Sequence, residues 1–553
     1  MWDAIADVVV VGTGVAGFAA AVTAASEGAD VLLLEKAQAI GGTTVKSSAT
    51  MWIPNNPVMR RLGLEDPRAD ALRYMAKVGF PTIYDPDSPT LGLPPHHHRM
   101  LETFYDRGSE AYEYLDRLGV IDVDETQATR YPDYHADLPE DLAPVGRSLR
   151  IAVPEGWRFG HDTTGGQMLI DRMAGYAAQH GARVRLGCRA SQLVQDTDGA
   201  VVGVMAEQPP GSALIGARRA VIFASGGFLH NPELRREFLR GPVFGGAASE
   251  TSTGDFIAIA TAAGARLGNM THAWWDQVVL ELAIDAPTTR DVVSPFGDSM
   301  LMVNRHGMRV LNEKMPYSER GPVHFNWDVG RREYPNLLLF MIYDEQVAQD
   351  PSTSRFRWPI PPPGDSASYV VSGPDWDGLT HAIAERLEEL RRHTGGLTLA
   401  DEFTANLRRT VDRFGEFARS GKDLAFHRGE TPIEQAWNRQ GQTEPSSTTM
   451  RPFADAGPFH CVILGAGALD TKGGPVTDAD AHVLGDHDQP IPGLYGAGNC
   501  VASPVGQAYF GPGGTVGPGL TFGYIAARNA VAEPSRWPRG ELELNGPLRP
   551  VRV

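Results

Sequence analysis

Tyr509 stands immediately before a glycine- and proline-rich stretch that can bring its phenol and several backbone amides to one ligand. The stretch occupies residues 510–519 and contains Gly513 and Gly514. Glycines let a ligand approach the backbone closely, and the free amides at a helix start favour negative charge. A helix is expected to follow, with Pro518 as its first residue. The stretch therefore predicts a site for a flat or anionic group.

A second glycine pattern lies at the other end of the chain. Gly12, Gly14 and Gly17 follow Asp7 and the apolar run 8–11 and open an alanine-rich helical pattern, and the next apolar run ends at Glu35. In this order the pyrophosphate of a dinucleotide meets the helix start, and the acidic residue takes the ribose hydroxyls. Two glycine patterns at opposite chain ends indicate one cofactor held from both, and we expect FAD.

Further small and polar residues extend the predicted FAD site. Residues 36–48 can wrap a second side of the pyrophosphate and reach the isoalloxazine edge, and the apolar run 219–223 ends in glycines that face the adenine side. For each motif alone, a glycine-rich turn without a ligand is the alternative. The predicted cofactor contacts are Gly12, Gly14, Val15, Ala16, Gly17, Glu35, Lys36, Gly41, Gly42, Thr43, Thr44, Ser47, Ser48, Ala224, Gly226, Gly498, Asn499, Gly514 and Val516.

Composition narrows the class of protein. The net charge of −17 repels phosphate backbones and anionic lipid, so nucleic acid is not an expected partner. The 3 cysteines are far apart, which predicts a reducing compartment and neither disulfides nor a metal site.

Histidines 96–98 are expected in an exposed loop. Residues 8–25 lack charge, but the glycine spacing and the acidic flank argue against a membrane span or signal sequence, so we expect a soluble, cytoplasmic protein.

The order of patterns predicts the architecture. Strand-like runs at 182–187 and 200–205 continue the nucleotide-binding sequence, whereas residues 279–450 carry a proline-rich loop and a charged helical pattern at 379–392. We therefore expect an α/β fold: a Rossmann-like FAD-binding domain (1–278 and 451–553) with an inserted α+β substrate domain (279–450).

Taken together, these motifs resemble the flavoproteins of the fumarate reductase type and, among them, the 3-ketosteroid Δ1-dehydrogenases. The resemblance covers about residues 5–530. It rests on the N-terminal glycines with Glu35, on residues 41–44, 469–474 and 494–499, and most specifically on 509–513. It implies noncovalent FAD, a steroid substrate and an external electron acceptor that the sequence does not identify. No histidine lies between Gly12 and Pro95 to carry the covalent flavin of some relatives.

The same resemblance implies roles for four residues. The Tyr509 hydroxyl and the Gly513 amide hold the C3 carbonyl oxygen, Tyr317 takes the C2 proton with Tyr134 hydrogen-bonded behind it, and hydride leaves C1 for flavin N5. The chemistry is sound on its own terms, because a C2–H next to a ketone becomes acidic when preplaced donors meet the developing enolate oxygen. A phenol, with a usual pKa of about 10, needs a second hydroxyl or a positive field to act as the base.

Other functions stay open at this stage. A fumarate or enoate reductase clamps a dicarboxylate with Arg and His, but no cation lies between Asn499 and Arg528, which favours a neutral ketone. A Δ4-type ketosteroid dehydrogenase and a flavin-binding protein without turnover are further alternatives. Each tyrosine taken singly is more often a packing residue than a catalytic one.

Overall fold

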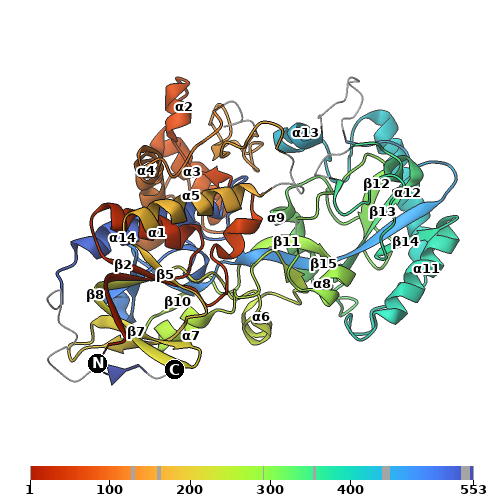
Figure 1. Ribbon diagram of the computed structural model, residues 1–553. Coiled ribbons are helices and arrows are strands. Elements are labelled where there is room, and N and C mark those ends of the chain that lie inside the picture. Colours follow the sequence, from red (N-terminus) through yellow and green to blue (C-terminus); the bar gives the residue numbers. More distant parts are fainter. Residues whose placement is uncertain are drawn as a thin grey trace. The chain divides into compact units, whose positions relative to one another are not determined.

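Two compact units make up the chain (Figure 1). The structure, a computed structural model, describes residues 2–125, 131–157, 163–289, 292–352, 357–438, 449–536 and 549–551. The first unit comprises residues 1–238, 248–273 and 470–553, and the inserted unit comprises 239–247 and 274–469. From the sequence we expect the inserted domain to begin after residue 278 and to end at residue 450. In the structure the main part of the inserted unit begins after residue 273 and ends at residue 469.

A nine-stranded sheet forms the centre of the first unit. Its parallel part consists of β1 (Ala4–Val11), β2 (Val31–Leu34), β5 (Arg183–Arg185), β8 (Gly211–Phe223) and β18 (Pro490–Gly496). Antiparallel pairing adds β6 (Arg189–Gln195), β7 (Val201–Gln208), β17 (His482–Leu484) and β19 (Arg549–Pro550). The valines of β1 are buried on both faces, as the uninterrupted apolar run predicts for a central parallel strand.

Helices cover both faces of this sheet. On one face α1 (Val15–Ser26) packs against α5 (Gly165–Gln179) and α14 (Val516–Ala532). On the other, α7 (Asp255–Ala262) places Phe256 on Phe223, with the ring centroids 4.0 Å apart. The uncharged run 8–25 is thus strand β1 and helix α1. In the described part of the chain, no helix is both long and apolar enough to cross a bilayer.

Two helix starts differ from the sequence prediction. Helix α14 begins at Val516 rather than at Pro518, because a proline inside the first turn lacks only an N–H that has no partner within the helix. Histidines 96–98 were expected in a loop, which is wrong: they form the first turn of α4 (Pro95–Arg117), whose leading proline is favoured at that position.

A small element of the first unit is important for the site. Strand β3 (Met51–Trp52) pairs antiparallel with β4 (Ser148–Leu149), and β3 also contacts α14. Helix α3 (Arg68–Gly79) packs on α4 in the same unit. These elements place residues distant in sequence around the start of α14.

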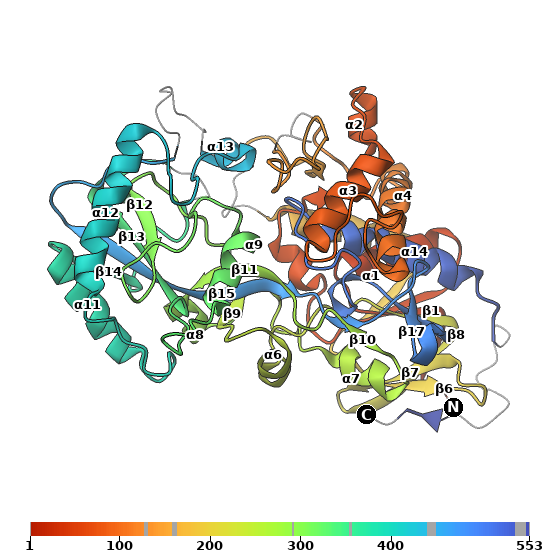
Figure 2. The ribbon, with the colours of Figure 1, turned by 180° about the vertical axis from the view of Figure 1, so that it is seen from behind.

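The inserted unit has a six-stranded sheet built on β15 (Phe459–Thr471). The other strands are β9 (Gly245–Gly246), β11 (Ala273–Val279), β12 (Met300–Val303), β13 (Leu338–Asp344) and β14 (Val370–Gly373). Helices α11 (Trp376–Glu389) and α12 (Phe403–Ser420) lie along one face, where their apolar side chains join the strands in one core (Figure 2). The predicted α/β class with an inserted α+β unit is confirmed.

Candidate functional site

A cleft of about 1070 Å³, counted to its open mouth, lies at the carboxyl ends of β1, β2 and β8. Open parallel sheets bind ligands at this edge. Most of the predicted cofactor residues line it: Gly12, Gly14, Val15, Ala16, Glu35, Lys36, Gly42, Thr43, Thr44, Ser47, Ala224, Gly226, Gly498, Asn499 and Val516.

The N-terminal glycines make the cleft fit a pyrophosphate. Gly12 has φ of 104°, and a Cβ there would lie 2.3 Å from the Ala224 carbonyl oxygen. A Cβ on Gly17 would lie 2.1 Å from the Gly12 oxygen, so Gly17 closes the turn from behind instead of lining the cleft. Gly14 is the N-cap of α1 and offers no capping side chain. The start of α1 therefore presents backbone amides to an anion.

Glu35 and Lys36 are held in place at the end of β2. The Glu35 carboxylate accepts from the Thr13 amide at 3.2 Å and from the Ala37 amide at 2.9 Å. Lys36 donates to Asp255 at 2.9 Å, and Arg189 donates to the same carboxylate at 3.0 Å. Burial alone would raise the pKa of Asp255, but these donors lower it to about 2. Sequence reasoning missed Asp255 and Arg189 because no motif contains them.

The residues of the hydroxyl-rich segment after Glu35 have different roles. Thr44 Oγ1 accepts from the Val15 amide at 3.0 Å, and Thr43 Oγ1 accepts from the Ser249 amide at 2.9 Å. Gly41 and Ser48 do not line the cleft. Gly41, with φ of 105°, shapes the turn, and the Ser48 hydroxyl pairs with Thr50 at 2.9 Å.

Asp470 is the main cleft residue that sequence reasoning did not single out, although it lies in the 469–474 motif. It is buried, accepts from the Gly227 amide at 3.0 Å and accepts from the Asn499 side chain at 3.2 Å. Burial raises the pKa of Asp470 to about 6. The other lining residues outside the predicted set are Val11, Thr13, Leu34, Cys188, Arg189, Ala190, Phe223, Ser225, Ser249, Thr251, Ser252, Asp255, Thr515 and Gly519.

Two of the predicted catalytic tyrosines meet in the first unit. The rings of Tyr134 and Tyr509 stack with centroids 5.4 Å apart, and both residues are at most 5% exposed. Gly514 does not line the cleft but packs on Tyr509, since a Cβ there would lie 3.1 Å from Tyr509 Cδ1. Gly513 has φ of 89°, and within the described residues its amide donates to no hydrogen-bond acceptor. A buried phenol and an available amide therefore share one loop.

Tyr317 belongs to the inserted unit. It is half-buried and is the first residue of the short helix α9 (Tyr317–Arg320). A buried ion cluster occupies the preceding segment, where the Glu313 carboxylate pairs with Arg309 at 2.8 Å and with Arg428 at 3.1 Å. Burial opposes ionisation of Glu313, yet the two guanidiniums lower its pKa to about 2.

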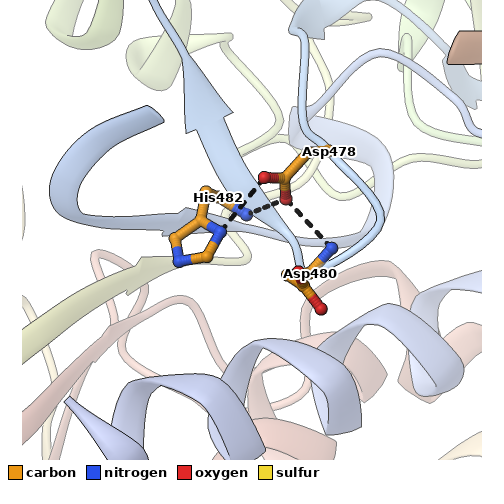
Figure 3. A group of neighbouring side chains, drawn as sticks. All are labelled: Asp478, Asp480 and His482. Atoms are coloured by element: carbon orange, nitrogen blue, oxygen red, sulfur yellow. Dashed lines mark hydrogen bonds and ion pairs between the residues drawn. The ribbon is translucent and has the colours of Figure 1, made fainter. Parts of the chain in front are cut away.

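A further group of titratable side chains lies at the turn before β17 (Figure 3). Asp478 accepts from the amides of Asp480 and His482 at 3.0 and 2.9 Å, and its second oxygen lies 3.1 Å from His482 Nδ1. These hydrogen bonds shape the turn itself and account for the grouping. The expectation that the protein has no metal site stays a prediction.

Comparisons with known proteins agree with the cleft. The FAD binding domain family matches residues 7–516. The 3-oxosteroid 1-dehydrogenase of Mycolicibacterium smegmatis is 30% identical over 95% of this chain and 97% of the relative. The 4-oxocyclohexanecarboxylate 2-dehydrogenase of Sinomonas cyclohexanicum is 28% identical over 97% of this chain and 94% of the relative.

Solved structures show the same fold. The 3-ketosteroid Δ1-dehydrogenase of Sterolibacterium denitrificans, in complex with 1,4-androstadiene-3,17-dione, superposes with a TM-score of 0.76 at 24% identity, covering 96% of this chain and 99% of that one. A flavocytochrome c3 fumarate reductase superposes with a TM-score of 0.64 at 22% identity, covering 96% and 78%. The predicted FAD cofactor and oxidoreductase class are confirmed. The chain belongs to the FAD-binding domain family and is an FAD-dependent oxidoreductase related to the 3-oxosteroid 1-dehydrogenases.

Proposed function

We propose that the protein dehydrogenates a 3-ketosteroid and introduces a C1–C2 double bond. One observation carries this choice: buried Tyr509 and the available amide of Gly513 lie in a loop that leads through Thr515 and Val516 to the FAD cleft. One phenol and one amide form the donor pair that an enolate oxygen needs. The 3-oxosteroid 1-dehydrogenase relatives, which this chain matches over almost its whole length, support the same substrate class.

Each residue then has one task. Tyr509 and Gly513 donate hydrogen bonds to the C3 oxygen and stabilise the charge that develops when C2 loses its proton. Tyr317, from the inserted unit, takes that proton, and the Tyr134 hydroxyl assists it. FAD, when bound, supplies the acceptor for the hydride that leaves C1. Loss of a proton from C2 and of a hydride from C1 leaves the double bond.

The inserted unit is accordingly proposed as the substrate domain. Its contribution to the chemistry is Tyr317, and the absence of any cation between Asn499 and Arg528 in the sequence agrees with a neutral ketone. A dicarboxylate would instead need positive side chains in this motif.

Anaerobic titration of the purified yellow protein tests the function. We expect androst-4-ene-3,17-dione to bleach the flavin absorbance, because the bound cofactor is reduced when the ketone is dehydrogenated. A saturated 3-ketosteroid and 4-oxocyclohexanecarboxylate are added to the oxidised protein, where dehydrogenation bleaches the flavin. Fumarate is added to the photoreduced protein, where its reduction restores the flavin absorbance. Bleaching by the cyclohexane acid but by no steroid would contradict the proposal. Flavin that stays with the polypeptide after acid precipitation would contradict noncovalent binding.

We also propose a cytoplasmic protein that passes its electrons to an external acceptor. Cys188, Cys461 and Cys500 are buried free thiols, which fits a reducing compartment. Cell fractionation with an antibody against the chain tests the location, and turnover with a panel of artificial acceptors of graded potential narrows the class of acceptor.

A further inference from the structure

Arg147 is completely buried among three carboxylates of the first unit. Its guanidinium makes a bidentate pair with Asp66, with N–O distances of 2.8 and 2.9 Å. The remaining nitrogen donates to Asp133 at 2.6 Å and to Asp141 at 3.0 Å. The guanidinium also lies over the Tyr74 ring, 4.9 Å from its centroid.

This arrangement is costly for a purely structural feature. One buried cation faces three carboxylates, and removing charges from water costs several kcal/mol per ion unless each is fully paired. Burial raises the pKa of Asp133 to about 6 even though Arg147 favours its ionised form. A buried ion pair is therefore weak evidence of a role in stabilising the fold. The hydrogen bonds of the residues next to this ion pair indicate a different role.

The residues that follow Asp133 and Arg147 in sequence both form hydrogen bonds with the loop at residues 509–513. We call residues 509–513 the donor loop. Tyr134, next to Asp133, donates its amide to the Phe510 carbonyl at 2.8 Å. Ser148, next to Arg147, donates its hydroxyl to the Pro512 carbonyl at 2.7 Å.

Two aromatic residues complete the support. Trp52 donates its indole N–H to Asp133 at 2.9 Å and its backbone amide to the Gly513 carbonyl at 3.1 Å. Tyr74, under the guanidinium, donates its hydroxyl to the Phe510 carbonyl at 3.1 Å. The carbonyls of residues 510, 512 and 513 thus all accept from residues that contact the ion pair or follow it in sequence. Peptide groups fixed at their carbonyls also fix the direction of the neighbouring amides, including that of Gly513.

We propose that Arg147 is a positioning residue that, with Asp133, holds the donor loop so that the Tyr509 hydroxyl and the Gly513 amide converge on one enolate oxygen. The inference rests on the proposed function, which gives these two groups their task. A displacement of about 1 Å at such a site lowers the rate by roughly a hundredfold, so a rigid support outside the substrate pocket is consequential.

The test uses a ligand that mimics the enolate. A steroid with a phenolic A ring, such as estrone, places a phenolate oxygen where the C3 oxygen would lie, and its ionisation is visible in the ultraviolet spectrum. Binding of estrone and of androst-4-ene-3,17-dione to the holoenzyme is measured by perturbation of the flavin absorbance, together with kcat and KM. The variants are Asp133→Asn, which keeps the shape but removes a charge, and the milder Ser148→Ala and Tyr74→Phe.

We expect Asp133→Asn to weaken estrone binding and lower kcat by about tenfold or more, with a smaller ionised fraction of bound estrone, while affinity for the neutral ketone and FAD content change little. Ser148→Ala and Tyr74→Phe should shift the same preference by a few-fold, since each removes one hydrogen bond to the loop. Ser191→Ala and Tyr524→Phe are matched controls, because each loses one hydroxyl hydrogen bond elsewhere in the first unit.

The outcomes separate the two proposals. If the wild-type flavin is bleached by the ketosteroid but all three variants keep the wild-type preference between estrone and ketone, the positioning role is wrong and the function stands. If the wild-type flavin is not bleached, the proposed function fails, and the positioning role fails with it. Should Asp133→Asn not fold, Ser148→Ala and Tyr74→Phe decide the question alone.

Discussion

The sequence segments that carry the candidate tyrosines contain different buried charged residues in the two units. In the first unit Tyr134 follows Asp133, in a cluster where three carboxylates surround the guanidinium of Arg147. In the inserted unit Tyr317 lies in sequence between Lys314 and Arg320, both buried. A nearby cation favours a phenolate, whereas nearby carboxylates favour the neutral phenol. This difference is consistent with the proposal that Tyr317 abstracts the proton and that Tyr134 assists it.

Two buried cations of the inserted unit donate to backbone carbonyls. Lys314 donates to the Pro295 carbonyl at 2.7 Å, and Arg320 donates to the Val293 carbonyl at 2.6 Å. Burial, aided by Arg428, lowers the pKa of Lys314 to about 7. Asp298 and Glu313 act in the opposite direction on Lys314 and raise its pKa.

Removing the proposed base should give the largest loss of activity. If it did not, the contrast drawn between Tyr317 and Tyr134 would be wrong. In Tyr317→Phe we expect proton abstraction at C2 to fall by about a hundredfold to ten-thousandfold, while substrate still binds through Tyr509 and Gly513. Deuterium exchange at C2 of a bound ketosteroid measures this step separately from hydride transfer. Wild-type exchange should increase with pH toward a limit below about 10, since a working base needs a lowered pKa.

The control for that experiment is Tyr334→Phe, which alters an exposed tyrosine of the same unit. Exchange in Tyr317→Phe as fast as in wild type would transfer the role of base to another residue, with Tyr134 the first to test. The proposal that Tyr317 abstracts the proton would then be wrong.

Removing a donor should have a smaller effect. In Tyr509→Phe we expect FAD to stay bound and turnover to fall by on the order of a hundredfold, the usual loss for one oxyanion donor. Steady-state kinetics at matched flavin content measure it. Activity within a few-fold of wild type would remove Tyr509 from the site and leave the stacked pair with Tyr134 as packing.

The difference between the units also explains what the sequence could predict. In the first unit much of the cofactor cleft is built from backbone, and close approach requires glycine at fixed positions such as Gly12 and Gly17. The glycine spacing, together with the preceding strand and Glu35, therefore predicts the cleft. The parallel strands follow from uninterrupted apolar runs such as β1. Glycine alone does not say which side faces the ligand. Gly41 and Gly514 are predicted at the cleft, but Gly41 shapes the neighbouring turn and Gly514 packs on Tyr509.

Side-chain networks were beyond sequence reasoning. Asp66 lies far in sequence from Asp133, Asp141 and Arg147, and only the fold brings the four residues together. The same holds for Asp255 with Lys36 and for Glu313 with Arg428. Charged residues are usually exposed, so composition and periodicity predict a solvated surface where these are buried.

A substitution of Gly12, in the turn between β1 and α1, tests whether the cofactor cleft depends on close approach of the backbone. In Gly12→Ala the new Cβ would lie 2.3 Å from the Ala224 oxygen at φ of 104°, so we expect a loss of about 3 kcal/mol in stability of the first unit and poor FAD retention. Gly28→Ala is the control, because it has φ of 80° with no heavy atom within 4 Å and should cost only about 1–2 kcal/mol. Flavin content and thermal unfolding measure both, and equal effects would mean that strain in φ, not close approach, makes Gly12 necessary.

The smallest expected effect is the pH dependence of stability that the buried Lys314 of the inserted unit causes. Because the folded-state pKa of Lys314 is lowered from 10.5 to about 7, the unfolded chain binds more protons between these two values, and stability rises with pH across that interval. Wild type should gain about 1 kcal/mol between pH 7 and 8 relative to Lys314→Met, which has no proton to release. Urea unfolding followed by a probe in the inserted unit measures it. Lys314→Met should be more stable than wild type below pH 7 and approach it above pH 10, while Lys422→Met, at an exposed site, should leave the slope unchanged. Parallel pH profiles for wild type and Lys314→Met would mean that Lys314 stays protonated over this range. The segment before Tyr317 would then keep a buried positive charge, in contrast to the three carboxylates around Arg147 in the segment of Tyr134.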